Sequence, residues 1–258
     1  MIPARKRFGQ HFLHDPAVRQ KIVEAIAPRP SDRMVEIGPG PGALTAGLIE
    51  AAGRIDAIEI DRDLSAALAA RFGQQLDLHT SDALEFDFPA LARQRGGPLR
   101  IVGNLPYNIS TPLLFHLLDG IDDIVDLHVM LQKEVVDRMA AAPGSEAYGR
   151  LTVMLAPRLE ITRLFDVGPG AFQPRPRVWS AVARLTVLPR PRFIVPPAFG
   201  AVVAAAFSQR RKTLRNSLRT VLPSDAFAAT GIDSGARPES LPPAAFAALA
   251  ALAPLPGV

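Results

Sequence analysis

Three alternating glycines, Gly38, Gly40 and Gly42, follow a short apolar run in the stretch VEIGPGPGALT, residues 35–45. Glycines let the backbone turn sharply and approach a ligand closely, and a helix predicted to follow offers free amide groups at its start. A dinucleotide fingerprint, G-x-G-x-x-G, would place its third glycine one residue later. The spacing here is G-x-G-x-G, preceded by Glu36, and departs from that fingerprint. Glycines at a helix start can also be present for purely steric reasons, so the turn alone does not establish a ligand site.

Two carboxylates follow the next two predicted strands. Glu59 lies in IDAIEID and Asp82 in HTSDALEF. A carboxylate at the position of Glu59 can accept hydrogen bonds from both hydroxyls of a ribose, and Asp82 could accept one from an adenine amino group. Either acid alone would more often be a helix cap. Because the glycine turn and both acids occupy the ends of three consecutive strands, they favour an adenosine-containing cofactor, a class that also includes NAD.

The motif Asn104, Leu105, Pro106, Tyr107 ends the fourth predicted strand, in IVGNLPYNIST. The N6 of adenine is a poor nucleophile because its lone pair is delocalised into the ring. The Asn104 amide oxygen and a main-chain carbonyl near Leu105 could accept its two N–H bonds and aim the lone pair at an electrophilic methyl group. Pro106 would fix the turn. The Tyr107 ring offers a face on which an extruded base can stack.

A second ring supports this hypothesis. Phe172 lies in AFQPRPRVWS, a proline-spaced connection between the last two predicted strands, and could close over the other face of the base. The alternatives are a simple turn with a buried Tyr107 and a loop-anchoring role for Phe172. The position of the motif beside a nucleoside site favours the catalytic interpretation.

Elements that alternate between strand and helix must position these residues. Apolar runs rich in Ile, Val and Leu occur at residues 34–37, 55–60, 76–79, 99–102 and 124–131, separated by helical segments. This alternation predicts a mostly parallel, doubly wound α/β sheet of Rossmann-like type. Residues 159–167 and 180–188 also resemble strands and predict an antiparallel pair that closes the sheet. Asp15 followed by Pro16 predicts the start of a helix that Pro28 ends.

The end of the chain differs from this core. It is helical, Ala-rich and interrupted by prolines, which predicts a larger α/β domain at residues 1–190 and a small all-α domain at residues 191–258. Arg211, Arg215 and Arg219 recur every four residues and predict one ridge of a helix, beside an apolar stripe. A run of cations without an acid favours phosphate contact over an ordinary solvated face. The expected RNA-binding residues are Arg210, Arg211, Lys212, Arg215 and Arg219, with a second patch at Arg5, Lys6 and Arg7.

Composition excludes several classes of protein. The 258 residues are 48% hydrophobic, which suits one sizeable core plus a small domain, and 29 basic against 25 acidic residues give a net charge of +4. The absence of cysteine excludes disulfides, thiol nucleophiles and cysteine-ligated zinc, and no metal site is expected. The basic start lacks the apolar run of a secretory signal, and no apolar stretch approaches the ~20 residues that cross a bilayer. We therefore expect a cytoplasmic protein.

Seven stretches together resemble the ribosomal RNA small-subunit adenine dimethyltransferases. They are KRFGQHFLHD, VEIGPGPGALT, AIEID, GNLPYNIST, MLQKEVVDRM, FQPRPRVWS and FSQRRKTLRNSL, in the order of that family and over almost the whole chain. Two positions depart from the family's pattern: His11 replaces the usual Asn, and Trp179 stands where an acidic or small polar residue is expected. Trp179 could extend an aromatic substrate surface or serve in packing.

The resemblance implies a class I methyltransferase fold and S-adenosylmethionine as cofactor. It implies dimethylation of N6 of two adjacent adenosines near the 3' end of 16S rRNA, an rRNA-processing step of small-subunit biogenesis. The partner would be the immature small ribosomal subunit, and nothing in the sequence requires more than a monomer. By the same resemblance the cofactor contacts are His11, Leu13, Gly38, Glu59, Asp82 and Asn104, to which the glycine turn adds Gly40.

Three alternatives remain open at this stage. The first is the 23S rRNA adenine methyltransferase of the macrolide-resistance type, which shares similar motifs, although QRRKTLRNSL favours the small-subunit enzyme. The second is a ribosome-assembly factor in which methylation is secondary. The third is a nicotinamide dehydrogenase, against which both the glycine spacing and the NLPY motif argue.

Overall fold

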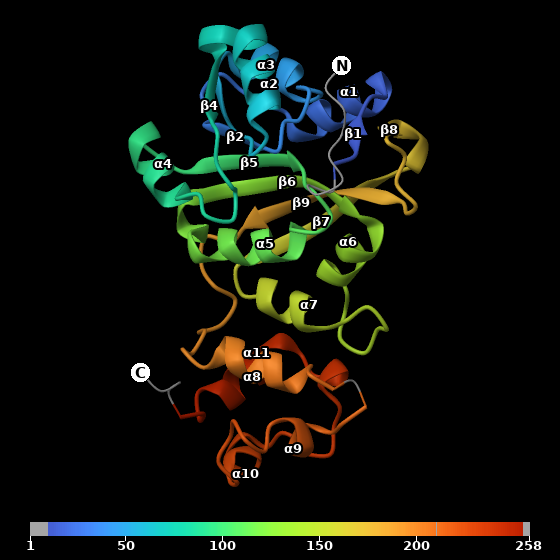
Figure 1. The fold of residues 1–258 in the computed structure, drawn as a ribbon. Coiled ribbons are helices and arrows are strands. Elements are labelled where there is room, and N and C mark those ends of the chain that lie inside the picture. The colour runs from blue at the N-terminus through green and yellow to red at the C-terminus, as the bar shows by residue number, and fades with distance from the viewer. Residues whose placement is uncertain (1–9, 210, 255–258) are drawn as a thin grey trace. The chain divides into compact units, whose positions relative to one another are not determined.

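The computed structural model describes residues 10–209 and 211–254, which form two compact units (Figure 1). The first unit ends at Val136 and resumes at Ile161–Val187, and the second comprises Asp137–Glu160 and the residues from Leu188 onward. The sequence placed the domains at residues 1–190 and 191–258. The C-terminal unit therefore also takes in an internal stretch, residues 137–160, that the sequence pattern did not separate from the sheet.

A seven-stranded, mostly parallel sheet forms the first unit. Its strands lie in the order β4-β3-β2-β5-β6-β9-β7, and β9 runs antiparallel to β6. This is the class I methyltransferase topology, so the predicted fold class is confirmed. The bounds are β2 Met34–Ile37, β3 Ile55–Ile58, β4 Leu76–His79, β5 Leu99–Asn104, β6 Ile124–Gln132, β7 Leu159–Val167 and β9 Ser180–Val187.

The strands that carry the predicted site are short and buried. Every residue of β2 and β3 is buried, as expected for parallel strands covered by helices on both faces. In Figure 1, α1 (Pro16–Ile26), α2 (Thr45–Ala52) and α3 (Arg62–Phe72) lie on one side of the sheet and α5 (Ser110–Asp119) on the other. The rings of Phe88 and His116 lie 5.8 Å apart and join α4 (Phe88–Arg95) to α5.

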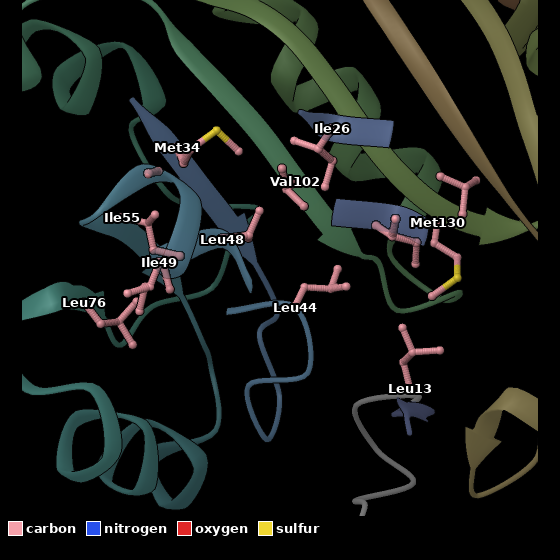
Figure 2. Close-up of a cluster of buried hydrophobic side chains, with 14 of the residues drawn as sticks. Leu13, Ile26, Met34, Leu44, Leu48, Ile49, Ile55, Leu76, Val102 and Met130 are labelled. Atoms are coloured by element: carbon pink, nitrogen blue, oxygen red, sulfur yellow. The ribbon is translucent and has the colours of Figure 1, made fainter. Parts of the chain in front are cut away.

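An apolar cluster holds the first three helices against the sheet (Figure 2). Leu44 and Leu48 from the start of α2 share it with Met34 of β2, and Leu13 joins it from the N-terminal segment. The Asp15 carboxylate accepts hydrogen bonds from the backbone amides of Ala17 and Val18, which caps α1 as predicted. Residues 10–13, which precede this cap, line the cavity at the carboxyl ends of the parallel strands.

A short strand pair that the sequence did not predict lies beside the main sheet. β1 (Phe12–Leu13) pairs antiparallel with β8 (Phe172–Gln173), so that Leu13 faces Phe172. Two-residue strands carry no periodicity of their own, and this one is defined by its distant partner. The pairing ties the N-terminal segment to the connection between β7 and β9.

The C-terminal unit is helical. Its core contains the ring of Phe246 and the side chains of Val202 and Leu218, and the hydroxyl of Tyr148 donates to the Leu241 carbonyl at 2.7 Å. No helix within the described residues is both long enough and apolar enough to span a membrane. The helix bounds are α7 Arg150–Leu155, α8 Phe199–Ala206, α9 Leu214–Ser217, α10 Ala226–Thr230 and α11 Pro243–Ala250, and α6, Lys133–Met139, spans the boundary between the units.

The continuous basic helix predicted across Arg211, Arg215 and Arg219 is wrong. Only α9, Leu214–Ser217, is helical there. The backbone amides of Leu214 and Arg215 donate to the carbonyls of Ala236 and Ser234 instead of continuing a helix, and Thr213 is extended. The apolar stripe predicted beside these cations comprised Leu214, Leu218, Val221 and Leu222, of which all but the half-buried Val221 are buried.

Replacement of Gly103 by alanine is expected to destabilise the sheet beneath the site. A Cβ at Gly103 of β5 would lie 2.8 Å from the backbone oxygen of Ile37 in β2, and backbone atoms cannot move aside cheaply. Gly103→Ala should lower the free energy of unfolding in urea by about 1–3 kcal/mol. Gly170→Ala, where an added Cβ meets no atom within 4 Å, should change it by at most about 0.5 kcal/mol. Equal urea midpoints for the two variants would contradict the close approach of β2 and β5.

Candidate active site

A cavity of about 320 Å³ lies at the carboxyl ends of the parallel strands of the first unit. This is the edge at which open α/β sheets bind ligands. The structure brings ten of the predicted cofactor and catalytic residues together around it: His11, Leu13, Gly38, Gly40, Glu59, Asp82, Asn104, Leu105, Pro106 and Tyr107.

The glycine turn after β2 shapes one wall of the cavity and orients Glu59. Gly40 has a φ of +57°, a conformation that favours glycine, and an added Cβ would lie 3.1 Å from the ring of Phe12. Its backbone amide donates to Oε2 of Glu59 at 3.1 Å, and the amide of Asp61 donates to Oε1 at 2.9 Å. Each carboxylate oxygen can accept a further hydrogen bond. Glu59 is thus fixed in a geometry suited to paired hydroxyl groups.

A second carboxyl group, Glu36 of β2, lies in the same cavity and was not predicted as a site residue. It is 2% exposed, and the hydroxyl of Thr45 at the start of α2 donates to its Oε2 at 2.6 Å. Burial raises the pKa of Glu36 to about 7, and the neighbouring Glu59 carboxyl adds to the rise. Burial also raises the pKa of Glu59. The only sequence signal for Glu36 was an acid immediately before the glycine turn.

Asp82 approaches the cavity from the loop after β4. Its Oδ1 accepts a hydrogen bond from the amide of Leu84 at 2.9 Å, which fixes the carboxylate in a tight turn. Its partly buried side chain lines the cavity. The turn leaves Oδ2 for a donor such as an exocyclic amine.

Asn104, the last residue of β5, connects the strand to the N-terminal segment. Its Nδ2 donates to the backbone oxygen of His11 at 2.9 Å. Because the amide nitrogen is used in this way, Oδ1 is the atom of the amide that can accept a hydrogen bond from a ligand. Leu105 is buried, its amide donates to Met130 of β6 at 3.1 Å, and Pro106 begins a turn whose carbonyl accepts from Ile109.

The aromatic wall of the cavity consists of Tyr107 and His11. Their ring centroids lie 5.4 Å apart at 31°. The Tyr107 hydroxyl bonds to Oγ of Ser180 at 2.6 Å, and burial raises the pKa of the Tyr107 phenol, so the ring stays neutral near pH 7. The Nδ1 of His11 donates to the Pro174 carbonyl at 2.7 Å, which places the imidazole proton on Nδ1. Two hydrogen bonds thus hold the rings in place.

Phe172 does not join this wall. It is 1% exposed, belongs to the apolar cluster beneath the cavity, and pairs with Leu13 through β8. The physical reason is that β1 covers this part of the connection, so the ring anchors the loop. This corresponds to the alternative considered for Phe172 from the sequence and corrects its placement as a lid over a base.

The predicted RNA-binding cations that the structure describes do not line the cavity. Arg5, Lys6, Arg7 and Arg210 lie outside the described residues. Arg211, Lys212, Arg215 and Arg219 are all exposed, and the guanidinium of Arg215 donates to Oγ of Ser234 at 2.9 Å. Within the part of the chain that the structure describes, no group of three or more His, Asp or Glu side chains could hold a metal ion.

Comparison with known proteins identifies the family. The family described as "Ribosomal RNA adenine dimethylase" matches residues 1–253. The chain belongs to this family. Its members are methyltransferases, so the chain is an enzyme that requires a methyl donor.

Curated relatives and solved structures agree with this assignment. "Ribosomal RNA small subunit methyltransferase A" of Methylococcus capsulatus is 56% identical over 92% of this chain and 93% of its own length. The protein of the same name from Pseudomonas aeruginosa is 51% identical, with 98% and 96% covered. The 23S rRNA methyltransferase ErmE shares 26% identity and a TM-score of 0.70, with 93% and 98% covered. A dimethyladenosine transferase from Plasmodium falciparum shares the fold, with 24% identity, a TM-score of 0.78, and 94% and 99% covered.

The buried Glu36 predicts a specific dependence of stability on pH. Because the pKa is higher in the folded state than its ordinary value of 4.5, the folded protein binds this proton more tightly. The contribution is greatest below about pH 4.5 and is lost as the pH rises through about 7, a loss of about 3 kcal/mol.

Urea unfolding of Glu36→Gln beside the wild type checks this dependence. Between about pH 5 and about pH 8 the wild type should lose about 2.5 kcal/mol more stability than Glu36→Gln, which cannot ionise but can still accept from Thr45. The matched control is Glu50→Gln, an exposed position on α2, which should follow the wild type. Parallel pH profiles for the wild type and Glu36→Gln would show that Glu36 titrates normally.

Proposed function

We propose that this protein uses S-adenosylmethionine to dimethylate N6 of two adjacent adenosines near the 3' end of 16S rRNA. The observation that carries the proposal is a single cavity that holds both the fixed carboxylate of Glu59 and the oriented amide of Asn104. The first group suits a nucleoside cofactor and the second suits an exocyclic amine. Relatives more than 50% identical over nearly the whole chain carry the name of a small-subunit rRNA methyltransferase.

The residues at the cavity fit S-adenosylmethionine. Glu59 would accept from the ribose hydroxyls, Asp82 from the adenine amino group, and the Gly38–Gly40 turn would let the backbone approach the ligand closely. His11 and Leu13 would close the cavity from the N-terminal segment. When bound, the cofactor supplies a methyl group on a positively charged sulfur.

Asn104 would position the substrate amine. Its Oδ1 accepts one N–H of the adenine N6, and a main-chain carbonyl near Leu105 accepts the other, which draws the nitrogen toward a tetrahedral geometry. This arrangement would aim the N6 lone pair at the methyl group that the bound cofactor would supply. The methylated nitrogen loses its proton to water, and Tyr107 offers the stacking face for the base. Two such transfers at each adenosine give the dimethylated product.

The proposed partner is the immature small ribosomal subunit, and the proposed setting is the cytoplasm, where the protein acts as a monomer. The exposed cations of the C-terminal unit, together with Arg5, Lys6, Arg7 and Arg210, would neutralise RNA phosphates. Such contacts position the RNA without reading its sequence. The fold that this chain shares with ErmE supports a rival specificity for 23S rRNA. Because the chain is 26% identical to ErmE and 56% identical to a small-subunit methyltransferase, the small-subunit substrate is favoured.

Transfer of tritium from labelled S-adenosylmethionine to small subunits that lack the modification tests the proposal. After digestion to nucleosides, the label should appear as N6,N6-dimethyladenosine in 16S rRNA. Label in 23S rRNA alone would establish the rival specificity. Label in neither RNA would refute the proposed reaction, even if the protein still bound immature subunits as an assembly factor.

Asn104→Ala should reduce the rate of methyl transfer at least about 100-fold, because misplacement of a reacting group by about 1 Å costs that much. The measurement is the single-turnover rate at saturating cofactor. Gln75→Ala, which removes an exposed amide side chain after α3, is the matched control and should retain the wild-type rate. A wild-type rate for Asn104→Ala would remove the residue from the mechanism.

A further inference from the structure

The segment of residues 173–179, here called the proline loop, is exposed apart from one proline. It has the sequence QPRPRVW, and only Pro176 within it is buried. The loop leads from β8 into β9. Its two ends are attached to residues that line the cavity, since the carbonyl of Pro174 accepts from His11 and Ser180, which follows the loop, bonds to Tyr107.

Sheet register places the end of this loop at the edge of the sheet that carries the cavity. Ser180, the first residue of β9, is paired with Gln132 at the end of β6. β6 runs parallel to β5, where Asn104 is paired with Met130. β9 is the second strand from β5, and neighbouring strands lie ~4.8 Å apart, so Ser180 lies about 10 Å across the sheet from β5. Trp179 immediately precedes Ser180. Trp179 therefore lies at the same edge of the sheet as Asn104 and the cavity.

Trp179 is unusual within the loop because its large ring is 56% exposed. The outer edge of the indole lies against Gly168, 3.6 Å from where a Cβ would be, so one end of the ring rests on backbone. The Trp179 carbonyl accepts from the amide of Lys133 at 2.9 Å, which fixes the backbone beneath the ring. An indole that is held in place yet exposed contributes little to the core and offers a fixed aromatic face to a ligand.

The charge around the ring favours a nucleic acid. Arg175 and Arg177 are exposed, and neither has a hydrogen bond or ion pair with another described residue. Residues 168–180 contain no Asp or Glu. An aromatic face flanked by uncompensated cations matches single-stranded RNA, in which bases stack on rings and phosphates bind cations.

We propose that Trp179 is a stacking platform for an unpaired RNA base next to the target adenosine, with Arg175 and Arg177 binding the adjoining phosphates. The proposal rests on the proposed function and adds a substrate-binding surface outside the cavity. It assigns the departure at Trp179 a role in substrate binding.

Fluorescence tests the stacking directly, because Trp179 is the one tryptophan of the chain. A protein-free RNA oligonucleotide containing the two adjacent adenosines, added to the wild-type protein, should quench the tryptophan emission until it saturates. The RNA concentration at half of the full quenching should equal the midpoint of binding measured by filter retention. Quenching by complete subunits but not by the RNA would point to a ribosomal protein as the neighbour of Trp179 and would overturn the proposal.

Variants separate stacking from charge. Trp179→Ala should weaken RNA binding by about 5- to 150-fold, and Trp179→Phe should restore most of the affinity. Trp179→Ala should leave the salt dependence of RNA binding unchanged. Arg175→Gln and Arg177→Gln should each make the negative slope of the logarithm of the association constant against the logarithm of salt concentration less steep by about 0.7. Val178→Ala, at a 43% exposed neighbour, is the matched control and should bind like the wild type.

Cofactor binding distinguishes the possible failures. All of these variants should bind S-adenosylmethionine with unchanged affinity, since none lines the cavity. If the wild type methylates 16S rRNA while Trp179→Ala binds RNA normally, the stacking proposal is wrong and the proposed function stands. If the wild type methylates no RNA, the proposed function itself fails.

Discussion

The hydrogen bond from the Asn104 side-chain amide to the His11 carbonyl is the interaction on which the site depends. It occupies the amide nitrogen and leaves the oxygen as the group that can accept from a ligand. It also ties the end of β5 to the N-terminal segment, which β1 in turn joins to β8. Segments from the beginning, middle and end of the first unit are thereby brought together around one cavity. The proposed chemistry requires this arrangement because positioning, and no strong base, activates the amine.

The cavity also contains two buried carboxyl groups, an arrangement that costs stability. Glu59 is compensated by the amides of Gly40 and Asp61, while Glu36 has the hydroxyl of Thr45 and a pKa near neutrality. Uncompensated burial of charge is expensive, so such groups persist where a ligand or a precise geometry needs them. The backbone amides that stabilise the Glu59 carboxylate also orient it toward the cavity. The glycine turn therefore both stabilises this buried acid and positions it for a ligand.

Sequence reasoning located most of the sheet and the cavity residues, for identifiable reasons. The buried parallel strand β2 is a continuous apolar run and was predicted at its observed bounds, as were the edge strands β4 and β7. Residues that follow parallel strands necessarily meet at one edge of the sheet. Pairing of β1 with β8 joins residues about 160 positions apart and leaves no local pattern. The same pairing buries Phe172, which is why its placement was wrong. Around Leu214, hydrogen bonds to Ser234 and Ala236 replaced those of a helix, a tertiary effect that periodicity cannot reveal.

A crystal structure with S-adenosylhomocysteine and adenosine bound would test the role of Asn104 most directly. The quantity to measure is the distance from the adenosine N6 to the side-chain oxygen of Asn104. The account predicts a hydrogen-bonding distance of about 3 Å, with the amide nitrogen still bound to the His11 carbonyl. An adenosine bound elsewhere, or a side chain turned so that its nitrogen faces N6, would contradict it.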